Sequence, residues 1–427
     1  MNLNSRLIYN TMSEVVFNLK SKATPDPNTK HKVLTFHILE SHFKETTDLL
    51  QIKKTPLRQK KANLMNTQVR NMPEYQNEDQ PIETNPCFKV IFPTQEDRDY
   101  FGELLKVKIL PTTRSIWFPH RPSHELKGMM YITDEPVIPK YPIYILSKGR
   151  WDTRFTSKTL EEMNVPYKIV VEPQEYDNYK QHISPDKIII LPDEYLNKDQ
   201  GGIPARNFIW QHSIDNGHTA HWVIDDNIKG FFRWNHNKKL PLKSGICFKL
   251  IEDYYDSTEN VAQCGIQYTS FYPEISLRRP LFIPNTRIYS CILQKNDIDL
   301  PERWRGKYNE DTDLSLRLLK HGYSTLLFQN FLCGKQTTLS VKGGNQQIYS
   351  GDGLQQKLDS LINQHPDVVK GTVKFKKVHH QVNYKPYKDN EIIYKDITFP
   401  TYPDIKLVKN PDSEESVDDE EDEQDSV

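Results

Sequence analysis

The segment His221-Trp-Val-Ile-Asp225-Asp226-Asn227 is a short apolar run that ends in two acids and an amide. An apolar run of this length is typical of a strand buried on both faces of a parallel sheet. Ligands of open α/β sheets bind beyond the carboxyl ends of the strands. Two adjacent carboxylates there repel each other unless a cation neutralises them, and Asp and Asn oxygens suit Mg²⁺ or Mn²⁺. A metal site is therefore one hypothesis, and an acid pair in an ordinary turn is the alternative.

Apolar runs and helical stretches alternate on both sides of this segment, which predicts an α/β fold with a mostly parallel sheet flanked by helices. The runs before it are Ile143–Leu146, Ile169–Val171 and Ile188–Leu191, and the helical stretches are Thr153–Asn164, Gln174–His182 and Pro204–Asn216. After it, strands are expected at Cys264–Phe271, Arg287–Leu293 and Thr325–Leu332, and helices at Glu310–His321 and Leu354–Asn363.

Changes in composition divide the chain into four parts. Residues 1–70 form a polar segment of unknown role, and residues 391–427 form an extended, acidic tail that we expect to be disordered. Between them, residues 71–138 are predicted to form a small α+β module, and residues 139–390 the main domain. The module consists of a strand at Cys87–Pro93, a helix capped by Thr94 and a strand at Arg114–Pro119.

Charge and cysteine content restrict the class of protein. The net charge is −1, but residues 411–427 carry ten acidic residues and no basic ones, so residues 1–410 carry about +9. A positive body attracts polyanions such as nucleic acids or diphosphates. The five cysteines are scattered, which argues against a disulfide framework or zinc site. With no predicted membrane span or signal peptide, we expect a cytoplasmic protein.

A second acidic motif, Asn309-Glu310-Asp311-Thr312-Asp313, opens the predicted helix at Glu310–His321. The positive end of a helix dipole favours acids, which is a sufficient structural explanation. The functional alternative is that one of these acids is a general base that takes a proton from an acceptor hydroxyl.

These two motifs, in this order and on this strand pattern, resemble the GT-A glycosyltransferases. Three further segments resemble the family: Ser147-Lys148-Gly149-Arg150, Val171-Glu172-Pro173 and the stretch from Gly201 to Asn207 that contains Ala205-Arg206-Asn207. The resemblance covers about residues 141–335 and implies a GT-A, Rossmann-like fold.

The resemblance also implies roles for single residues. Donor-nucleotide binding falls to Ser147, Arg150, Glu172, Arg206 and Asp225. Metal binding falls to Asp226 with Asp225, and His379 or its neighbour His380 is a candidate for a late ligand. Asp311 is implied as the catalytic base, with Glu310 orienting the acceptor. The chain departs from the family pattern at Asn227, where the family often has an Asp.

A closer resemblance is to phage glycosyltransferases that are associated with TET/JBP-type oxygenases and act on hydroxymethylated pyrimidines in DNA. It rests on Ile143–Arg150, the Ile203–Asn207 stretch, Val223–Asn227 and Asn309–Tyr323. It implies an inverting, Mn²⁺- or Mg²⁺-dependent transfer from a nucleotide sugar, with UDP-glucose as the default donor. The implied acceptor is 5-hydroxymethylcytosine or 5-hydroxymethyluracil in DNA, in the host cytoplasm if the protein is phage-encoded, with no membrane partner.

Three other functions are compatible with the sequence. The first is a glycosyltransferase that acts on a protein or polysaccharide acceptor. The second is a non-catalytic DNA-binding or assembly protein on a transferase-like fold, and the third is a nucleotidyltransferase. A glycine turn at Gly343-Gly344-Asn345, flanked by Lys335 and Lys342, suits closure over a diphosphate or is an ordinary loop. The sequence leaves the oligomeric state open.

Overall fold

A computed structural model of the chain describes residues 4–9, 13–18, 33–38, 53–56, 87–92, 94–110, 113, 115–118, 126–196, 198–235, 238–272, 280–336, 353–374, 377–398, 400–411 and 413. Two compact units, divided near residue 127, make up the chain, and each is described by itself. The glycine turn at residues 343–345 and most of the acidic tail lie outside the described residues. In the described part, no helix is long and apolar enough to span a membrane.

The N-terminal unit contains a six-stranded sheet of order β4-β2-β1-β5-β3-β6 with one described helix, α3, at Gln95–Leu105. Thr94 caps this helix as predicted, since its Oγ1 accepts from the Asp97 N–H at 3.1 Å. The strands are β1 Asn4–Tyr9, β2 Ser13–Asn18, β3 Val33–Ile38, β4 Lys53–Pro56, β5 Cys87–Ile91 and β6 Ser115–Phe118.

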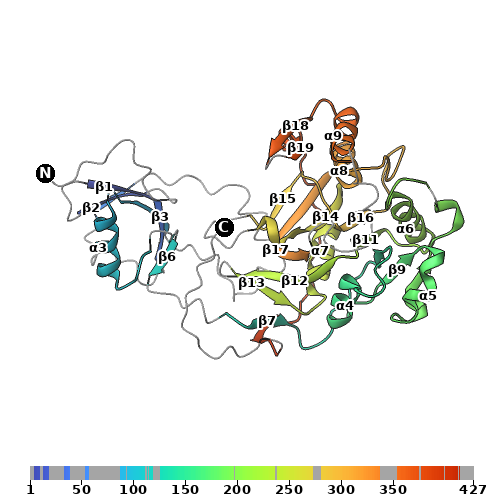
Figure 1. The fold of residues 1–427 in the computed structure, drawn as a ribbon, viewed down its shortest axis with the longest axis horizontal. Helices are drawn as coiled ribbons and strands as arrows, with labels where there is room; N and C mark the ends of the chain where they lie inside the picture. The colour runs from blue at the N-terminus through green and yellow to red at the C-terminus, as the bar shows by residue number, and fades with distance from the viewer. Residues whose placement is uncertain are drawn as a thin grey trace. The chain divides into compact units, whose positions relative to one another are not determined.

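The second unit is a mixed α/β structure around a large sheet of order β10-β9-β8-β11-β16-β14-β17-β12-β13-β7-β20, with β15 paired to β17 (Figure 1). Strands β10, β9, β8 and β11 are mutually parallel, which confirms the predicted parallel core. Strand β16 is antiparallel to β11 and to β14, so β14 again runs in the direction of β11. The carboxyl ends of β8, β9, β11 and β14 therefore lie at one edge of the sheet.

The strands of this sheet are β7 Met129–Ile132, β8 Ile143–Leu146, β9 Lys168–Val171, β10 Ile188–Ile190, β11 Ala220–Asp225, β12 Ile228–Asn235, β13 Lys238–Leu242, β14 Val261–Tyr268, β15 Phe282–Pro284, β16 Cys291–Lys295, β17 Ser324–Lys335 and β20 Lys406–Lys409. The helices are α4 Phe155–Glu162, α5 Tyr176–Tyr179, α6 Ile203–Asp215, α7 Ile246–Asp256, α8 Glu310–Lys320 and α9 Gly353–Gln364. A hairpin of β18 Val369–Lys374 and β19 Lys377–Val382 packs on α9.

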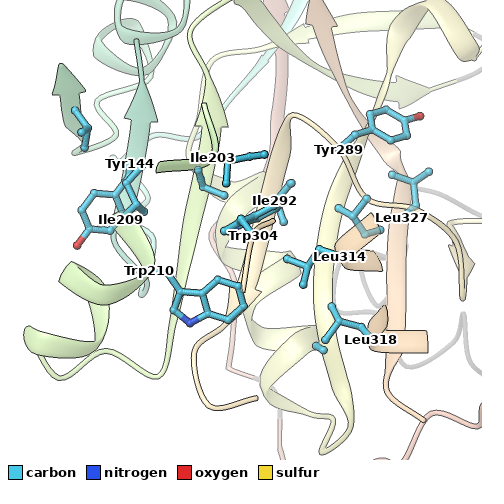
Figure 2. Close-up of a cluster of buried hydrophobic side chains, with 14 of the residues drawn as sticks. Tyr144, Ile203, Ile209, Trp210, Tyr289, Ile292, Trp304, Leu314, Leu318 and Leu327 are labelled. Atoms are coloured by element: carbon cyan, nitrogen blue, oxygen red, sulfur yellow. The ribbon is translucent and has the colours of Figure 1, made fainter. Parts of the chain in front are cut away.

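Helices pack on both faces of the sheet, and neighbouring residues of a strand point to opposite faces. Val223 of β11 joins a buried cluster with Trp210 of α6 and Leu314 of α8 on one face (Figure 2). Trp222, the preceding residue, contacts Phe248 of α7 on the other face, with ring centroids 5.1 Å apart. This double burial explains why the core strands are continuous apolar runs rather than alternating ones.

Two predicted strands differ in the structure. The strand expected at Cys264–Phe271 ends at Tyr268, and Thr269–Phe271 is a 3-10 helix. The run Arg287–Leu293 was expected to be extended throughout, but β16 begins only at Cys291. Ser290 adopts a left-handed backbone with φ of 62°, which ends any extended segment at this point. The turn brings Ser290 beside the carboxyl end of β11, where its carbonyl accepts from the Asp225 N–H at 2.8 Å.

A buried carboxylate on α7 fixes the start of the parallel core. Glu252 accepts from the backbone N–H groups of Lys140 and Tyr141, at 2.6 and 3.1 Å, and from the Trp222 indole at 2.8 Å. It thereby ties the segment that enters β8 to β11 and α7. Burial raises the pKa of Glu252 to about 7, against the three donors that favour the carboxylate.

Replacing this carboxylate should destabilise the fold. Glu252→Gln puts an amide NH₂ where both carboxylate oxygens accept N–H donors, so at least one buried bond is lost. We expect the free energy of unfolding to fall by about 1–3 kcal/mol in urea titrations, because a buried N–H donor loses its acceptor. The control is Asp256→Asn, which removes the charge from the partly exposed pair with Lys140 but keeps an oxygen that can accept from the Tyr141 hydroxyl, and which should cost less than about 1 kcal/mol. Equal losses in the two variants would contradict the anchoring role.

Candidate functional site

Asp225, the last residue of β11, lies in a cage of three donors. Its Oδ1 accepts from Arg206 Nη2 at 2.8 Å, and its Oδ2 accepts from Lys335 Nζ and Ser290 Oγ, each at 2.7 Å. Burial alone would raise the pKa of Asp225, but Lys335 and Arg206 outweigh burial and hold the pKa well below its ordinary value. Three segments far apart in sequence therefore converge on this carboxylate.

Asp226 faces a different group of partners. Its carboxylate forms an ion pair with Arg150 and accepts from Ser147 Oγ at 2.7 Å. Both partners lie in the turn that follows β8. Burial raises the pKa of Asp226, and Arg150 opposes this effect. The two adjacent acids thus avoid repulsion by binding separate cations.

Asn227 completes the motif with an amide that is only partly satisfied. Its Nδ2 donates to the Gln336 carbonyl at 3.4 Å, whereas its buried Oδ1 has no hydrogen-bond partner. A buried acceptor without a partner costs about 1–3 kcal/mol, so this oxygen is a candidate contact for a ligand.

Arg206 connects the two predicted acidic motifs. It belongs to the first turns of α6, and its side chain is about 5% exposed. Besides its bond to Asp225, its Nε lies 3.6 Å from Glu310 Oε1, and its guanidinium stacks on the Trp304 ring at 5.0 Å. Its Nη1 is buried without a hydrogen-bond partner. Burial raises the pKa of Glu310, and Arg206 acts against this shift.

Asp311 lies at the first turn of α8, among cations from both sides. It raises the pKa values of Arg206 and Lys335 on one side and of Arg287 on the other. One of its carboxylate oxygens accepts from the backbone N–H of Thr312 at 2.6 Å. Asp311 therefore acts electrostatically on Arg206 and Lys335, the two cations that bind Asp225.

The turn after β8 is built by hydrogen bonds to its backbone and to Ser147. Ser147 Oγ lies 2.6 Å from the Tyr179 hydroxyl, which also accepts from the Arg150 N–H at 3.2 Å. Gly149 has φ of 66°, a conformation that favours glycine, and its N–H donates to Glu175 at 2.9 Å. Glu172, at the end of β9, is bound to Lys148 at 2.7 Å and is partly exposed.

The two histidines differ in their surroundings. His379 is exposed on β19, whereas His380 is partly buried and its Nε2 lies 3.4 Å from Arg287 Nη1. Burial, together with Arg287, lowers the pKa of His380 to about 4. Among the described residues, no group of three or more His, Cys, Asp or Glu is arranged to hold a metal ion.

Sequence reasoning missed three residues of this site. The sequence pattern marks Lys335 only as a flank of the glycine turn, and Ser290 and Arg287 belong to no recognisable motif. The strand expected at Thr325–Leu332 extends to Lys335 in the structure. A cation close to the end of a buried apolar run was the signal that could have identified this residue. For Ser290, no local pattern predicts its left-handed turn.

Chemically, the site combines clustered cations with carboxylates at the carboxyl edge of a parallel sheet. Arg150, Arg206 and Lys335 offer positive charge for a phosphorylated ligand. Asp311 offers an oxygen that can accept a proton. This combination suits the transfer of a group away from a phosphate-containing leaving group.

Comparison with known proteins finds a family whose model matches part of the chain. No curated protein matches the chain. Residues 141–344, however, match the model of the TET-associated glycosyltransferases. This segment runs from the residue pair before β8 to beyond β17 and contains Asp225, Asp226, Arg206 and Asp311. The site described above therefore lies within the part of the chain that is similar to the TET-associated glycosyltransferases.

Proposed function

We propose that the protein transfers a sugar from a nucleotide sugar to the hydroxymethyl group of 5-hydroxymethylcytosine or 5-hydroxymethyluracil in DNA, with inversion at C1 and with UDP-glucose as the default donor. The observation that carries the proposal is the convergence of Arg206, Lys335 and Asp225 with Asp311 at one sheet edge. Similarity to this family supports the sugar transfer, and the association with TET enzymes supports a modified base as acceptor.

The order of the strands supports a GT-A type of domain. The parallel strands β10, β9, β8 and β11 are followed in the sheet by the antiparallel β16 and then by β14. A nucleotide that binds beyond β8 and β9 would meet Ser147, Arg150 and Glu172. These residues are the proposed donor-nucleotide contacts, together with Arg206 and Asp225.

The diphosphate leaving group is proposed to lie against Arg150, Arg206 and Lys335. As the C1–O bond breaks, negative charge develops on the departing phosphate oxygen, and fixed cations stabilise it. The unpartnered Nη1 of Arg206 is a donor already oriented in the site.

Oxygen ligands for Mn²⁺ or Mg²⁺ are present at the same edge. Asp226 and Asp225 supply carboxylates, and the unpartnered Oδ1 of Asn227 supplies an amide oxygen. The ligand types fit such an ion, which binds proteins through one or two carboxylates and completes its shell with water and substrate phosphates. Bound there, it would offset the charge of the diphosphate. His379 stays the candidate for a further ligand.

The acceptor hydroxyl is proposed to lie beside Asp311. Its oxygen attacks C1 while the bond to the diphosphate breaks, and its proton passes to the Asp311 carboxylate. Glu310, paired with Arg206, is proposed to orient the acceptor or the sugar. A DNA acceptor also agrees with the charge of about +9 on residues 1–410.

The direct test is the product. We expect that incubation with hydroxymethylated DNA, UDP-glucose and Mn²⁺ yields a glycosylated pyrimidine nucleoside, detected by mass spectrometry after digestion. Parallel reactions contain unmodified DNA, free hydroxymethyl nucleoside and a panel of other nucleotide sugars. Sugar transfer to a protein or polysaccharide acceptor, with none to any hydroxymethylated DNA, would replace the proposed acceptor by that alternative.

The metal assignment is tested by donor binding rather than by turnover. Asp226→Asn keeps the size of the side chain but removes its charge. In calorimetry with UDP, we expect Mn²⁺ to tighten binding to the wild type and to have no such effect on the variant. Metal-free binding should persist through Arg206 and Lys335. An equal Mn²⁺ effect in both proteins, or none in the wild type, would show that these residues do not hold the ion.

The base assignment is tested by separating kcat from donor affinity. Asp311→Asn keeps the shape of the side chain but cannot take the acceptor proton, so kcat should fall about 10²–10⁴-fold with UDP affinity nearly unchanged. Glu310→Gln should instead raise the acceptor KM. A near-normal kcat for Asp311→Asn, or a retained anomeric configuration in the product by NMR, would contradict the assigned role.

A further inference from the structure

Three aromatic rings form a cluster at the carboxyl end of β14. Tyr268 and Tyr289 lie with ring centroids 4.5 Å apart, and Phe271 lies 5.6 Å from Tyr268 and 6.3 Å from Tyr289. We call these three residues the aromatic platform. Tyr289 is buried and Tyr268 is partly buried, whereas Phe271 is 52% exposed. The exposed part of the Phe271 side chain offers an apolar, aromatic surface.

The platform is joined directly to the acidic site. Lys335 Nζ lies 3.3 Å from the Tyr268 hydroxyl and 2.7 Å from Asp225 Oδ2. On the other side, the Arg287 guanidinium lies 4.7 Å from the Tyr289 ring centroid, and Asp311 raises the pKa of Arg287. The aromatic platform therefore borders the catalytic acids and carries a cation on each flank.

The position of the platform separates it from the donor nucleotide. Ser147, Arg150 and Glu172 follow β8 and β9, on one side of β11 in the sheet. Tyr268 ends β14, on the other side of β11, with β16 between them. A donor nucleoside beyond β8 and β9 leaves the β14 side of Asp225 for the second substrate.

The hydroxymethyl group of a paired pyrimidine projects into the major groove, and the partly buried acids of this site are easier to reach for a nucleotide that has left the stack. Enzymes that modify bases therefore take the nucleotide out of the stack, and aromatic side chains replace the lost stacking. Such a contact contributes about 1–3 kcal/mol per base. Flanking cations such as Lys335 and Arg287 suit the adjacent phosphates of the DNA strand.

We propose that Tyr268, Phe271 and Tyr289 form the acceptor-base site, and that the exposed ring of Phe271 stacks on the hydroxymethylated pyrimidine while its hydroxymethyl group faces Asp311. This inference rests on the proposed function, because it names the site at which the acceptor of that reaction binds. Tyr268 and Tyr289 act by supporting Phe271, whose ring makes the contact.

The test compares three substitutions of Phe271. Phe271→Ala removes the ring, Phe271→Leu keeps an apolar side chain without a ring, and Phe271→Trp keeps a stacking surface. We expect Ala and Leu to raise the KM for a hydroxymethylated oligonucleotide about 10-fold or more, and Trp to leave it near the wild-type value. Affinity for UDP, measured by calorimetry, should not change in any variant.

The matched control is Ile138→Ala, which truncates an equally exposed apolar side chain, 52% exposed, that precedes the start of β8. It should change neither KM nor UDP affinity. An unchanged oligonucleotide KM in Phe271→Ala overturns the inference and leaves the proposed function standing. A Leu variant that behaves as wild type overturns the stacking contact.

The failure of the proposed function has a different signature. If the wild type glycosylates no hydroxymethylated DNA, that function fails, and the platform is judged by binding of a fluorescent single-stranded oligonucleotide at low salt. Weaker anisotropy binding by Phe271→Ala, restored in Phe271→Trp, supports base stacking independently of turnover. Equal binding by wild type and Phe271→Ala overturns it.

Discussion

Two adjacent carboxylates at the end of a buried strand need positive charge, and much of this domain supplies it. Asp225 ends an apolar strand and Asp226 follows it, so the residues around them offer little solvation. The protein meets this constraint by bringing Arg150, Arg206 and Lys335 to them from the end of β8, the start of α6 and the end of β17. The parallel core is what makes this possible, because it gathers strand ends from distant segments at one edge.

A second buried network sets the helix that carries Asp311. Two residues further along α8, Asp313 is bound by Arg317 at 2.8 Å and by His365 at 2.9 Å. Burial raises the pKa of Asp313, but the hydrogen bond from His365 and the guanidinium groups of Arg305 and Arg317 outweigh burial and lower it to about 2. Arg317 also donates to the backbone carbonyls of Glu302 and Arg303. These residues precede Trp304, and the guanidinium of Arg206 stacks on the Trp304 ring. The position of α8 is thereby coupled to the guanidinium that binds Asp225.

The predictable part of the structure was the part encoded locally. Strand β8 begins and ends at the predicted residues, and α8 begins at Glu310, since apolar runs and capping signals depend on neighbours in the chain. The pairing of Asp225 with Lys335 depends on strand order, and no local pattern encodes it. The turn at Ser290 depends on its tertiary surroundings, which hold a left-handed backbone that serine rarely adopts.

The charge arrangement of the site bears on the proposed role of a divalent cation. Arg150, Arg206 and Lys335 are already paired with Asp225 and Asp226, and Glu310 shares Arg206. A diphosphate that approaches these cations must compete with carboxylates that already satisfy them. If Asp226 and Asn227 hold a divalent ion, as proposed, its charge would relieve this competition by offsetting both the carboxylate and the diphosphate, and the arginine donors would then be available to the leaving group. The ion pairs of Arg150, Arg206 and Lys335 with the two aspartates are therefore compatible with the proposed metal site. Each of these side chains can exchange its carboxylate partner for a phosphate when the donor binds.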